Sequence, residues 1–247
     1  MKEMRYFYVP EAAQQIELPQ EEAQHAVRVL RLREGDEIRL LDGQGHVFEA
    51  RLTLASQKHC LYEIIQQHTE PKTWRGTIHL AMAPTKMMER TEWMAEKATE
   101  IGFDALTFLD CRFSERRSLR IDRIEKIVCA AVKQSRKTWM PRVEGMTDFK
   151  TFVSQPFLGR KFIAHCYEEF PRTDLFEALQ QPSTDSSENV LMLVGPEGDF
   201  SADEVKYAVE ECGYASISLG ESRLRTETAA LMAVTMAQLT LRNIHQP

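Results

Sequence analysis

The chain has 247 residues, of which 43% are hydrophobic and 28% charged, and its formal net charge is −6 at pH 7. This balance is typical of a folded globular protein and excludes a disordered or collagen-like chain. No apolar run approaches the roughly 18 residues of a membrane span, and the N-terminus lacks the apolar core of a signal peptide. The five cysteines include no CxxC pair and the histidines no HExxH motif. We therefore expect a cytoplasmic protein with reduced thiols and no metal site.

Residues 1–72 are predicted to form a small β-rich domain. Short strand patterns occur there, and Asp42-Gly43 is a typical hairpin turn between two of them. Short strands joined by tight turns predict a small barrel. The expected strands are 5–9, 36–41 and 47–52, and a short helix is expected over 18–30. The pattern breaks at 68–74, so a second domain is expected over 73–247.

From residue 75 onward, strand and helix patterns alternate along the chain. This alternation predicts an α/β domain in which a mostly parallel sheet carries helices on both faces. The expected strands are 77–82, 105–109, 161–165, 190–194 and 216–219. The expected helices are 88–101, 120–138, 202–212 and 227–242. A polar, serine-rich loop is expected over 180–189.

A strongly basic segment lies inside this acidic chain. Ten Lys or Arg residues and only three Asp or Glu residues fall between positions 112 and 142. The basic residues that share one face of the expected helix are Arg123, Lys126, Lys133 and Lys137. Most charged helix faces are only solvated, but the scarcity of acids here favours a surface for RNA or another polyanion. The candidate RNA-binding residues are Arg28, Arg31, Arg112, Arg116, Arg117, Arg123, Lys126, Lys133, Arg136 and Lys137.

The first of two glycine-bearing loops follows a buried apolar strand. Gly198 can adopt a positive φ, and Pro196 stiffens the turn. The capping-box pattern Ser201-Ala-Asp-Glu204 predicts that a helix begins directly after the loop. Such a loop lies at the carboxyl edge of the sheet, where open α/β folds bind ligands. Its carboxylates, Glu197 and Asp199, favour a ligand with cationic or hydroxyl groups over a pyrophosphate.

The second loop follows the expected strand 216–219. It contains Arg223 and Arg225, and Thr226 is expected to be the N-cap of the long apolar helix that follows. Either loop alone is consistent with an ordinary connection between a strand and a helix. Two such loops on strands that we expect to be adjacent favour a shared ligand site.

Two motifs, Gly195-Pro-Glu-Gly198 and Leu219-Gly-Glu-Ser-Arg-Leu-Arg-Thr-Glu-Thr-Ala229, together resemble the signature of the ribosomal RNA small subunit methyltransferase E family. Supporting segments extend the resemblance over nearly the whole chain: 29–36, 86–102 and 131–136. Asp199 departs from the family pattern, which commonly has a second glycine at this position.

The resemblance implies a fold and a set of partners. The fold is that of the SPOUT class of methyltransferases, an α/β fold whose sheet carries a trefoil knot, with residues 1–72 as a PUA-like RNA-binding β-barrel. The implied cofactor is S-adenosyl-L-methionine (SAM), bound in a bent form among the knotted loops. The enzyme is implied to be a homodimer whose sites are completed across the interface. The implied partner is small-subunit rRNA or the 30S particle.

The implied reaction is methylation of N3 of one uridine in 16S-type rRNA. We expect Arg225 to stabilise the uridine anion and Glu197 or Glu227 to accept the N3 proton, unless these carboxylates only organise their loops. The residues expected to hold the cofactor are Val194, Gly195, Pro196, Glu197, Gly198, Leu219, Gly220, Leu224, Arg225, Thr226, Thr228 and Ala229.

Two other interpretations remain open. One is an RNA-binding or ribosome-assembly factor that keeps the fold without turnover. The other is a SPOUT enzyme that methylates the 2′-oxygen of a tRNA ribose. Binding of SAM with methyl transfer to RNA would distinguish an enzyme from an assembly factor without turnover. The identity of the modified nucleoside would distinguish a uridine-N3 methyltransferase from a ribose methyltransferase.

Overall fold

The structure, a computed structural model, describes residues 4–182 and 187–243, so residues 183–186 of the expected polar loop lie outside it. The chain forms two compact units. Unit 1 comprises Met1–Lys72 and Cys129–Met140, and unit 2 comprises Thr73–Val128 and Pro141–Pro247. The division after residue 72 falls at the expected boundary. However, the segment 129–140, which the sequence analysis assigned to the second domain, packs within unit 1. The assignment of the two domains by function stays a prediction.

Unit 1 is built on a four-stranded sheet in the order β1-β2-β3-β4. Strand β1 runs parallel to β2, and β2, β3 and β4 are antiparallel. Its elements are β1 (Tyr6–Tyr8), α1 (Gln20–Gln24), the π-helix η1 (His25–Val29), β2 (Glu37–Leu41), β3 (His46–Ala55) and β4 (Cys60–Thr69). Strand β4 was not predicted, because only Cys60 and Tyr62 along it are buried and the rest lacks a period of two.

Two glycines shape the turn between β2 and β3. Gly43 and Gly45 both adopt positive φ, and a Cβ added at Gly45 would collide with the Trp139 ring, whose nearest atom would lie only 2.5 Å away. The Gly45 amide donates a hydrogen bond to the Thr138 carbonyl at 2.9 Å. The predicted hairpin turn is therefore confirmed, and its glycines also make room for the segment Cys129–Met140.

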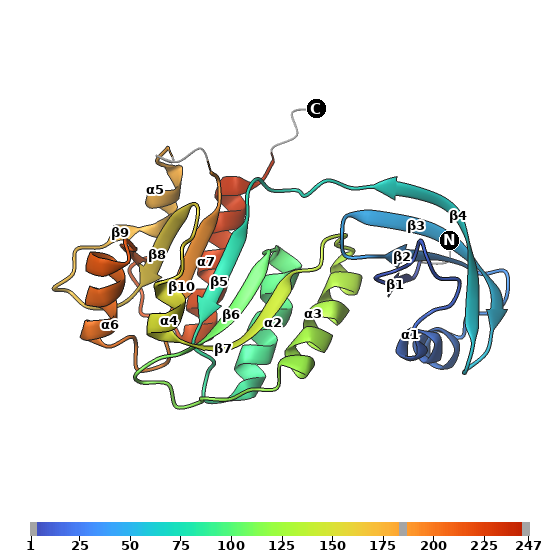
Figure 1. Ribbon diagram of the computed structural model, residues 1–247, viewed down its shortest axis with the longest axis horizontal. Coiled ribbons are helices and arrows are strands. Elements are labelled where there is room, and N and C mark those ends of the chain that lie inside the picture. Colours follow the sequence, from blue (N-terminus) through green and yellow to red (C-terminus); the bar gives the residue numbers. More distant parts are fainter. Residues whose placement is uncertain (1–3, 183–186, 244–247) are drawn as a thin grey trace. The chain divides into compact units, whose positions relative to one another are not determined.

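Unit 2 contains a seven-stranded sheet in the order β7-β6-β5-β10-β8-β11-β9 (Figure 1). All its described strand pairs are parallel, which confirms the expected parallel α/β sheet. The strands are β5 (Ile78–Met82), β6 (Ala105–Asp110), β7 (Arg142–Asp148), β8 (Arg160–Ala164), β9 (Thr173–Asp174), β10 (Val190–Val194) and β11 (Ala215–Ser218).

Helices cover both faces of this sheet. On one face α7 contacts β5 and β10 and packs against α2 and α5. On the other face α4, α6 and η2 bury Phe149, Phe152 and Val205 against apolar strand residues. The helices are α2 (Met88–Ile101), α4 (Phe149–Val153), α5 (Leu175–Gln180), α6 (Ala202–Lys206), the π-helix η2 (Tyr207–Glu211) and α7 (Thr226–Leu241). A further helix, α3 (Ile121–Ser135), begins in unit 2, and its residues from Cys129 onward belong to unit 1. Within the described part of the chain, no helix is long and apolar enough to cross a membrane.

Two expectations about the second loop are wrong. Strands β10 and β11 are not adjacent, because β8 lies between them and pairs with both. Thr226 is not the N-cap of α7. Arg225 occupies that position without a side-chain capping bond, and the side chain of Thr226 is buried in the first turn.

A polar network runs across three strands of unit 2. His79 on β5 lies with Nε2 2.8 Å from the Thr107 hydroxyl oxygen on β6, and that hydroxyl donates to Glu144 on β7 at 2.9 Å. Because the single hydroxyl hydrogen is used for Glu144, the His79 Nε2–H donates to Thr107. Burial lowers the pKa of His79 to about 4, so the ring is neutral at neutral pH.

We expect stability to fall between pH 6.5 and pH 4 because of His79. The unfolded chain binds a proton at this ring near pH 6.5, whereas the folded protein resists protonation until about pH 4. Between pH 7 and pH 5, the wild type should lose about 2 kcal/mol more free energy of unfolding than His79→Gln, which retains a donor for Thr107. Urea denaturation at pH 7, 6 and 5 measures this difference, and identical pH dependence would contradict the assignment.

Candidate functional site

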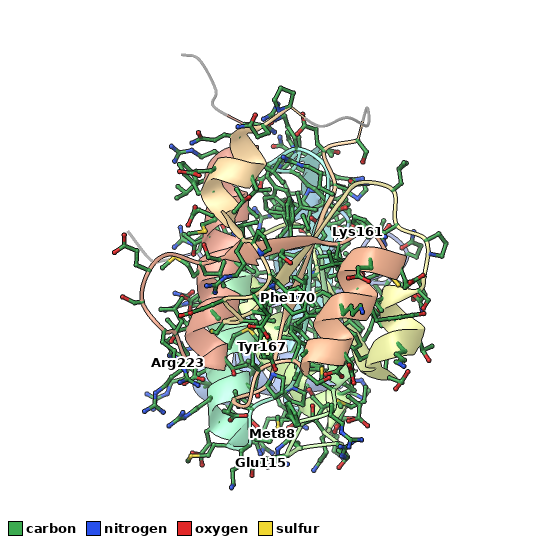
Figure 2. The ribbon with its side chains drawn as sticks, turned by 90° about the vertical axis from the view of Figure 1, so that its left-hand side faces the viewer. Met88, Glu115, Lys161, Tyr167, Phe170 and Arg223 are labelled. Carbon is green, nitrogen blue, oxygen red and sulfur yellow. The ribbon has the colours of Figure 1, made fainter. Side chains whose placement is uncertain are left out.

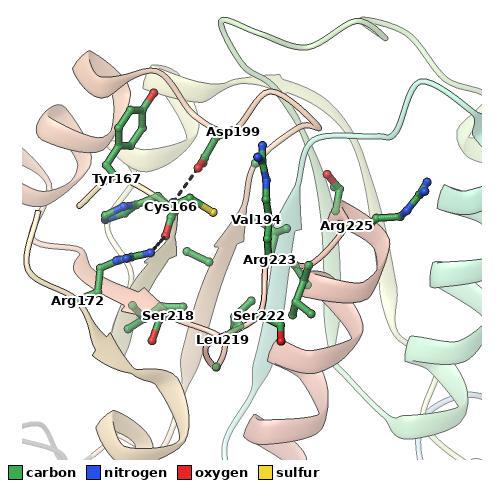
Figure 3. A pocket seen from close by; sticks show the side chains of 18 of the residues that line it. Cys166, Tyr167, Arg172, Val194, Asp199, Ser218, Leu219, Ser222, Arg223 and Arg225 are labelled. Carbon is green, nitrogen blue, oxygen red and sulfur yellow. Dashed lines mark hydrogen bonds between the residues drawn. The ribbon is translucent and has the colours of Figure 1, made fainter. Parts of the chain in front are cut away.

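The two loops line one cavity of about 1180 Å³ at the carboxyl edge of the sheet in unit 2 (Figure 3). We call Gly195–Phe200, after β10, the first loop, and Leu219–Arg225, after β11, the second loop. The end of β8 supplies a third wall, through residues 164–168. All three segments follow parallel strands, whose carboxyl ends meet at one edge of a sheet.

The first loop is a tight turn that requires glycine at position 195. A Cβ at Gly195 would lie 2.9 Å from the Phe200 amide nitrogen, a backbone atom that cannot move away cheaply. The Asp199 amide donates to the Pro196 carbonyl at 2.9 Å. The expected capping box is confirmed: Ser201 accepts from the Glu204 amide, and Glu204 accepts from the Ser201 amide.

Asp199, rather than Gly198, adopts the positive φ in this loop, with a value of 68°. Aspartate tolerates this left-handed region better than most residues. Its Oδ2 accepts a hydrogen bond from the Cys166 amide at 2.8 Å, and its Oδ1 accepts one from the Phe200 amide at 2.7 Å. The residue that departs from the family pattern therefore holds the first loop against the end of β8 (Figure 3).

The wall formed by the end of β8 is not among the site residues expected from the sequence. His165 is 4% exposed, burial lowers its pKa, and neither ring nitrogen has a hydrogen-bond partner within the described residues. Its carbonyl accepts from the Arg172 guanidinium at 2.7 Å. Burial and then the Asp199 carboxylate raise the pKa of the Cys166 thiol. The thiol is therefore protonated and unsuited to act as a nucleophile.

The second loop presents cations and main-chain polar groups to the cavity. The exposed Arg223 and Arg225 side chains leave this loop in different directions (Figure 3). Neither guanidinium has a hydrogen bond or ion pair within residues 4–182 and 187–243. In the same described ranges, no main-chain hydrogen bond involves the residues Gly220–Leu224. These groups are therefore available to a ligand.

Most residues expected to hold the cofactor lie around this cavity. Its lining includes Val194, Gly195, Pro196, Glu197, Gly198, Leu219, Gly220, Leu224, Arg225, Thr226 and Ala229. Thr228 is exposed on α7 and does not line it. Whether these residues bind a ligand stays a prediction, but the structure does bring them together.

The two candidate bases have different surroundings. Glu197 is exposed and lines the cavity, and its Oε1 accepts from the Lys86 amide at 2.9 Å. Glu227 is 8% exposed and does not line the cavity. Its Oε1 lies 3.4 Å from the Arg90 guanidinium of α2, and its Oε2 has no partner among the described residues.

The charges around the cavity are mixed. Acidic residues in its lining are Glu168, Asp174, Glu177, Glu197, Asp199 and Glu221, and the arginines are Arg90, Arg172, Arg223 and Arg225. No group of three or more His, Cys, Asp or Glu among the described residues is placed to hold a metal ion. This lining suits a ligand that carries both positive and negative groups.

Several of the basic residues predicted in unit 2 have acidic or carbonyl partners. Arg123 pairs with Glu92 at 2.6 Å, and Arg117 pairs with Asp110 at 2.7 Å. Arg116 donates to the Lys86 carbonyl at 2.7 Å. Arg112 and Lys126 are exposed. Acids are scarce within the segment 112–142, as the sequence shows, but several of its cations are paired because Asp110 and Glu92 come from other elements of the fold.

Some of the predicted basic residues of unit 1 also have partners, and others are exposed. Lys133 pairs with Glu22 of α1, and burial lowers the pKa of Lys137. Arg28 donates to the Gln57 side chain at 2.8 Å, and Arg136 lies over the Tyr6 ring at 5.5 Å. Arg31 is exposed with a φ of 54°. An uninterrupted row of free cations along α3 is therefore absent from the described residues.

Comparison with known proteins gives consistent matches. Residues 72–238 match an RNA methyltransferase domain family, and residues 18–65 match an RNA methyltransferase PUA domain. The chain is 30% identical to the ribosomal RNA small subunit methyltransferase E of Rickettsia conorii, over 91% of this chain and 89% of that protein. A crystal structure of a probable rRNA-methyltransferase from Porphyromonas gingivalis has a TM-score of 0.87 and 40% identity, covering 96% and 98% of the two chains.

A third relative has been solved with a ligand. The ribosomal RNA small subunit methyltransferase E from Neisseria gonorrhoeae, bound to S-adenosyl methionine, has a TM-score of 0.83 and 27% identity, with coverage of 96% and 98%. The fold and the match over residues 72–238 thus define unit 2 as an RNA methyltransferase domain. The chain belongs to the ribosomal RNA small subunit methyltransferase E family, and the segment that matches the PUA domain lies within unit 1.

We expect Asp199→Asn to increase the reactivity of Cys166. The carboxylate raises the pKa of this thiol, so removing its charge increases the thiolate fraction at pH 8. Asparagine also tolerates the left-handed backbone. The measurement is the rate of modification by a disulfide reagent, with Asp203→Asn on α6 as the control. An unchanged rate in Asp199→Asn would show that the carboxylate does not act on Cys166.

Proposed function

We propose that this protein transfers the methyl group of SAM to N3 of one uridine in small-subunit rRNA. The observation that carries the proposal is the cavity where the ends of β8, β10 and β11 meet, with Arg225 in its wall, whose guanidinium has no partner among the described residues. The proposal also draws on the rRNA named for the relatives and on the cofactor in the Neisseria gonorrhoeae structure.

The residues around the cavity fit SAM. Its adenosine needs hydrogen-bond partners, and the main-chain groups of Gly220–Leu224 have none within the described chain. The acidic residues of the lining suit the sulfonium and ammonium charges, and the arginines suit the carboxylate. The volume of about 1180 Å³ exceeds the roughly 300–1,000 Å³ of typical small-molecule sites, which leaves room for a base beside the cofactor.

The chemistry assigned to the protein is positioning and charge stabilisation. Bound SAM supplies an electrophilic methyl group, so no metal is required. The first and second loops hold the cofactor and align the uridine with it. Loss of the N3 proton leaves negative charge on the uracil oxygens, and the Arg225 guanidinium stabilises it without losing its own proton.

Glu197 is the stronger candidate for accepting the N3 proton, because it lines the cavity. Glu197 accepts one hydrogen bond, from the Lys86 amide. The carboxylate can therefore still accept a proton or further hydrogen bonds. We assign Glu227 the role of holding the start of α7 in position instead. Its ion pair with Arg90 connects the start of α7 to α2, next to Arg225.

The finer features of the SPOUT fold are part of the proposal. The trefoil knot is supported by the pairing of β10 with both β5 and β8, since the chain returns between two strands that precede it. A closed barrel in unit 1 is supported by the register shifts in the antiparallel pairing of β3 with β4, since such irregularities bend strands. The homodimer is supported by the exposed apolar residues Trp93, Met232 and Leu239 on the neighbouring helices α2 and α7.

RNA contacts are proposed for each unit on its own. In unit 1 the match to a PUA domain and the exposed Arg31 and Arg136 support RNA binding. In unit 2 the exposed Arg112 and Lys126 support it. The target base must be unpaired or flipped out, because N3 lies on the Watson–Crick edge. We place this reaction in the cytoplasm, with rRNA or the 30S particle as substrate.

The deciding experiment uses 30S particles and free rRNA from cells that lack this protein. Purified protein is incubated with each substrate and SAM, and nucleosides are identified by mass spectrometry. N3-methyluridine supports the proposal. A 2′-O-methyl nucleoside would support a ribose methyltransferase instead. SAM binding without transfer to any RNA, or no SAM binding at all, would leave a ribosome-assembly factor as the function.

We expect Gly195→Ala to abolish measurable SAM binding. The added Cβ would lie 2.9 Å from the Phe200 amide nitrogen, so the first loop must shift out of its turn. Gly145→Ala on β7 is the matched control, because its nearest non-neighbouring atom is 3.9 Å from the added Cβ. Calorimetric titration with SAM compares the two folded variants, and full affinity in Gly195→Ala would place the cofactor elsewhere.

We expect Arg225→Ala to lower kcat by about 10²-fold with little change in SAM affinity, because the guanidinium acts on charge that develops in the transition state. Arg242→Ala, at the other end of α7, should leave both quantities unchanged. Single-turnover kinetics and calorimetry measure the two effects. A wild-type rate in Arg225→Ala would remove this residue from the mechanism.

A further inference from the structure

A four-residue turn after β6 presents two exposed side chains beside the first loop. In this turn, Cys111–Ser114, the Cys111 amide donates to the Ser114 hydroxyl at 3.0 Å, and the Ser114 amide donates to the Cys111 carbonyl at 3.0 Å. Both end residues are buried. The two middle residues, Arg112 and Phe113, therefore face outward, and Phe113 is 48% exposed.

This turn is fixed against the first loop and the start of α6. The Arg112 amide donates to Glu204 Oε1 at 2.8 Å, and Glu204 is the capping-box residue that follows the first loop. A Cβ built on Gly198 would lie 3.2 Å from the Phe113 Cβ. Phe113 thus lies against a residue that lines the cavity, but it is not itself part of that lining.

The loop after β5 completes this surface. Its Lys86 amide donates to Glu197 at 2.9 Å, and its Lys86 ammonium pairs with Glu115 at 2.6 Å. Met87 is 51% exposed. In Figure 2, the labels of Met88, at the start of α2, and Glu115, directly after the turn, mark where these two segments lie, at the lower end of the view. Two exposed apolar side chains, Phe113 and Met87, thus come from segments that hydrogen bonds and an ion pair hold in place.

The chemistry of this surface matches a single unpaired nucleotide. A half-exposed phenylalanine offers a face on which any base can stack, and an arginine offers a partner for a phosphate. The Arg112 guanidinium has no partner within the described part of the chain. A target base in a single-stranded loop of RNA brings unpaired neighbours to the mouth of the cavity.

We propose that Phe113 stacks on the unpaired base adjoining the methylated uridine, and that Arg112 contacts the phosphate of the same nucleotide. This inference rests on the proposed function. The position of Phe113 outside the cavity, against Gly198, assigns it the neighbouring base and leaves the cavity to the cofactor and the target. Phe113 and Arg112 thus hold the RNA in position beside the cavity, and they do not touch the reacting atoms.

The test measures RNA binding separately from methyl transfer. Anisotropy of a fluorescent rRNA fragment that contains the target gives the RNA affinity, and calorimetry gives the SAM affinity. Phe113→Ala and Phe113→Leu should weaken RNA binding by about tenfold and leave SAM affinity unchanged. Phe113→Tyr should restore binding to within about twofold of the wild type. The matched control is Leu158→Ala, which truncates an exposed apolar residue just before β8, at the opposite edge of the sheet.

Arg112 is tested through the salt dependence of binding. Arg112→Gln should weaken RNA binding and reduce the slope of log affinity against log salt by about one. Arg75→Gln, just before β5 at the opposite edge of the sheet, is the control. An unchanged slope in Arg112→Gln would overturn the assigned phosphate contact.

The adjoining base is identified by a double-mutant cycle. The nucleotides on the 5′ and 3′ sides of the target are replaced, one at a time, by abasic residues. If Phe113 stacks on one of them, Phe113→Leu has little further effect on binding to that abasic RNA. Independent effects at both positions, or wild-type RNA binding by Phe113→Leu, would overturn the inference. The inference would also be overturned if the Phe113 variants altered dimerisation and left RNA affinity unchanged.

The outcomes separate this inference from the proposed function. Phe113-dependent RNA binding by a protein that transfers no methyl group would uphold the stacking surface and reject the enzymatic proposal. Wild-type RNA affinity in all Phe113 and Arg112 variants, together with formation of N3-methyluridine by the wild type, would do the reverse.

Discussion

The parallel pairing of β10 with both β5 and β8 is the constraint on which the site in unit 2 depends. Because all the strands of this sheet point the same way, the segments that follow them converge at one edge. The first loop, the wall after β8 and the turn after β6 are distant in sequence but adjacent in space for this reason. Hydrophobic burial of β10, which is buried along its whole length, stabilises this arrangement.

Asp199 shows how a local departure from a family pattern is accommodated. A glycine is the usual solution where the backbone is left-handed. Here an aspartate adopts the same conformation, and its carboxylate accepts two main-chain hydrogen bonds, one within the first loop and one from the end of β8. The cost of the backbone conformation is offset by bonds that a glycine cannot make.

The sequence predicted most of the elements that have a clear period or a cap. Helix α2 and strand β10 match their expected bounds, and the capping box at Ser201 is confirmed. Short elements such as β9 and α5 gave no such signal. Sequence also could not show that β8 separates β10 from β11, since strand order depends on tertiary contacts. The site predicted from the sequence therefore lacked its third wall, which contains His165 and Cys166.

Glu204 has a consequence for how the site responds to its ligands. One carboxylate oxygen accepts from the Ser201 amide at the start of α6, and the other accepts from the Arg112 amide in the turn after β6. A displacement that frees either amide leaves a buried charge undersatisfied, so the two segments become ordered together. Glu204 thus couples the segment after β10 to the turn after β6, so that a displacement of one segment acts on the other.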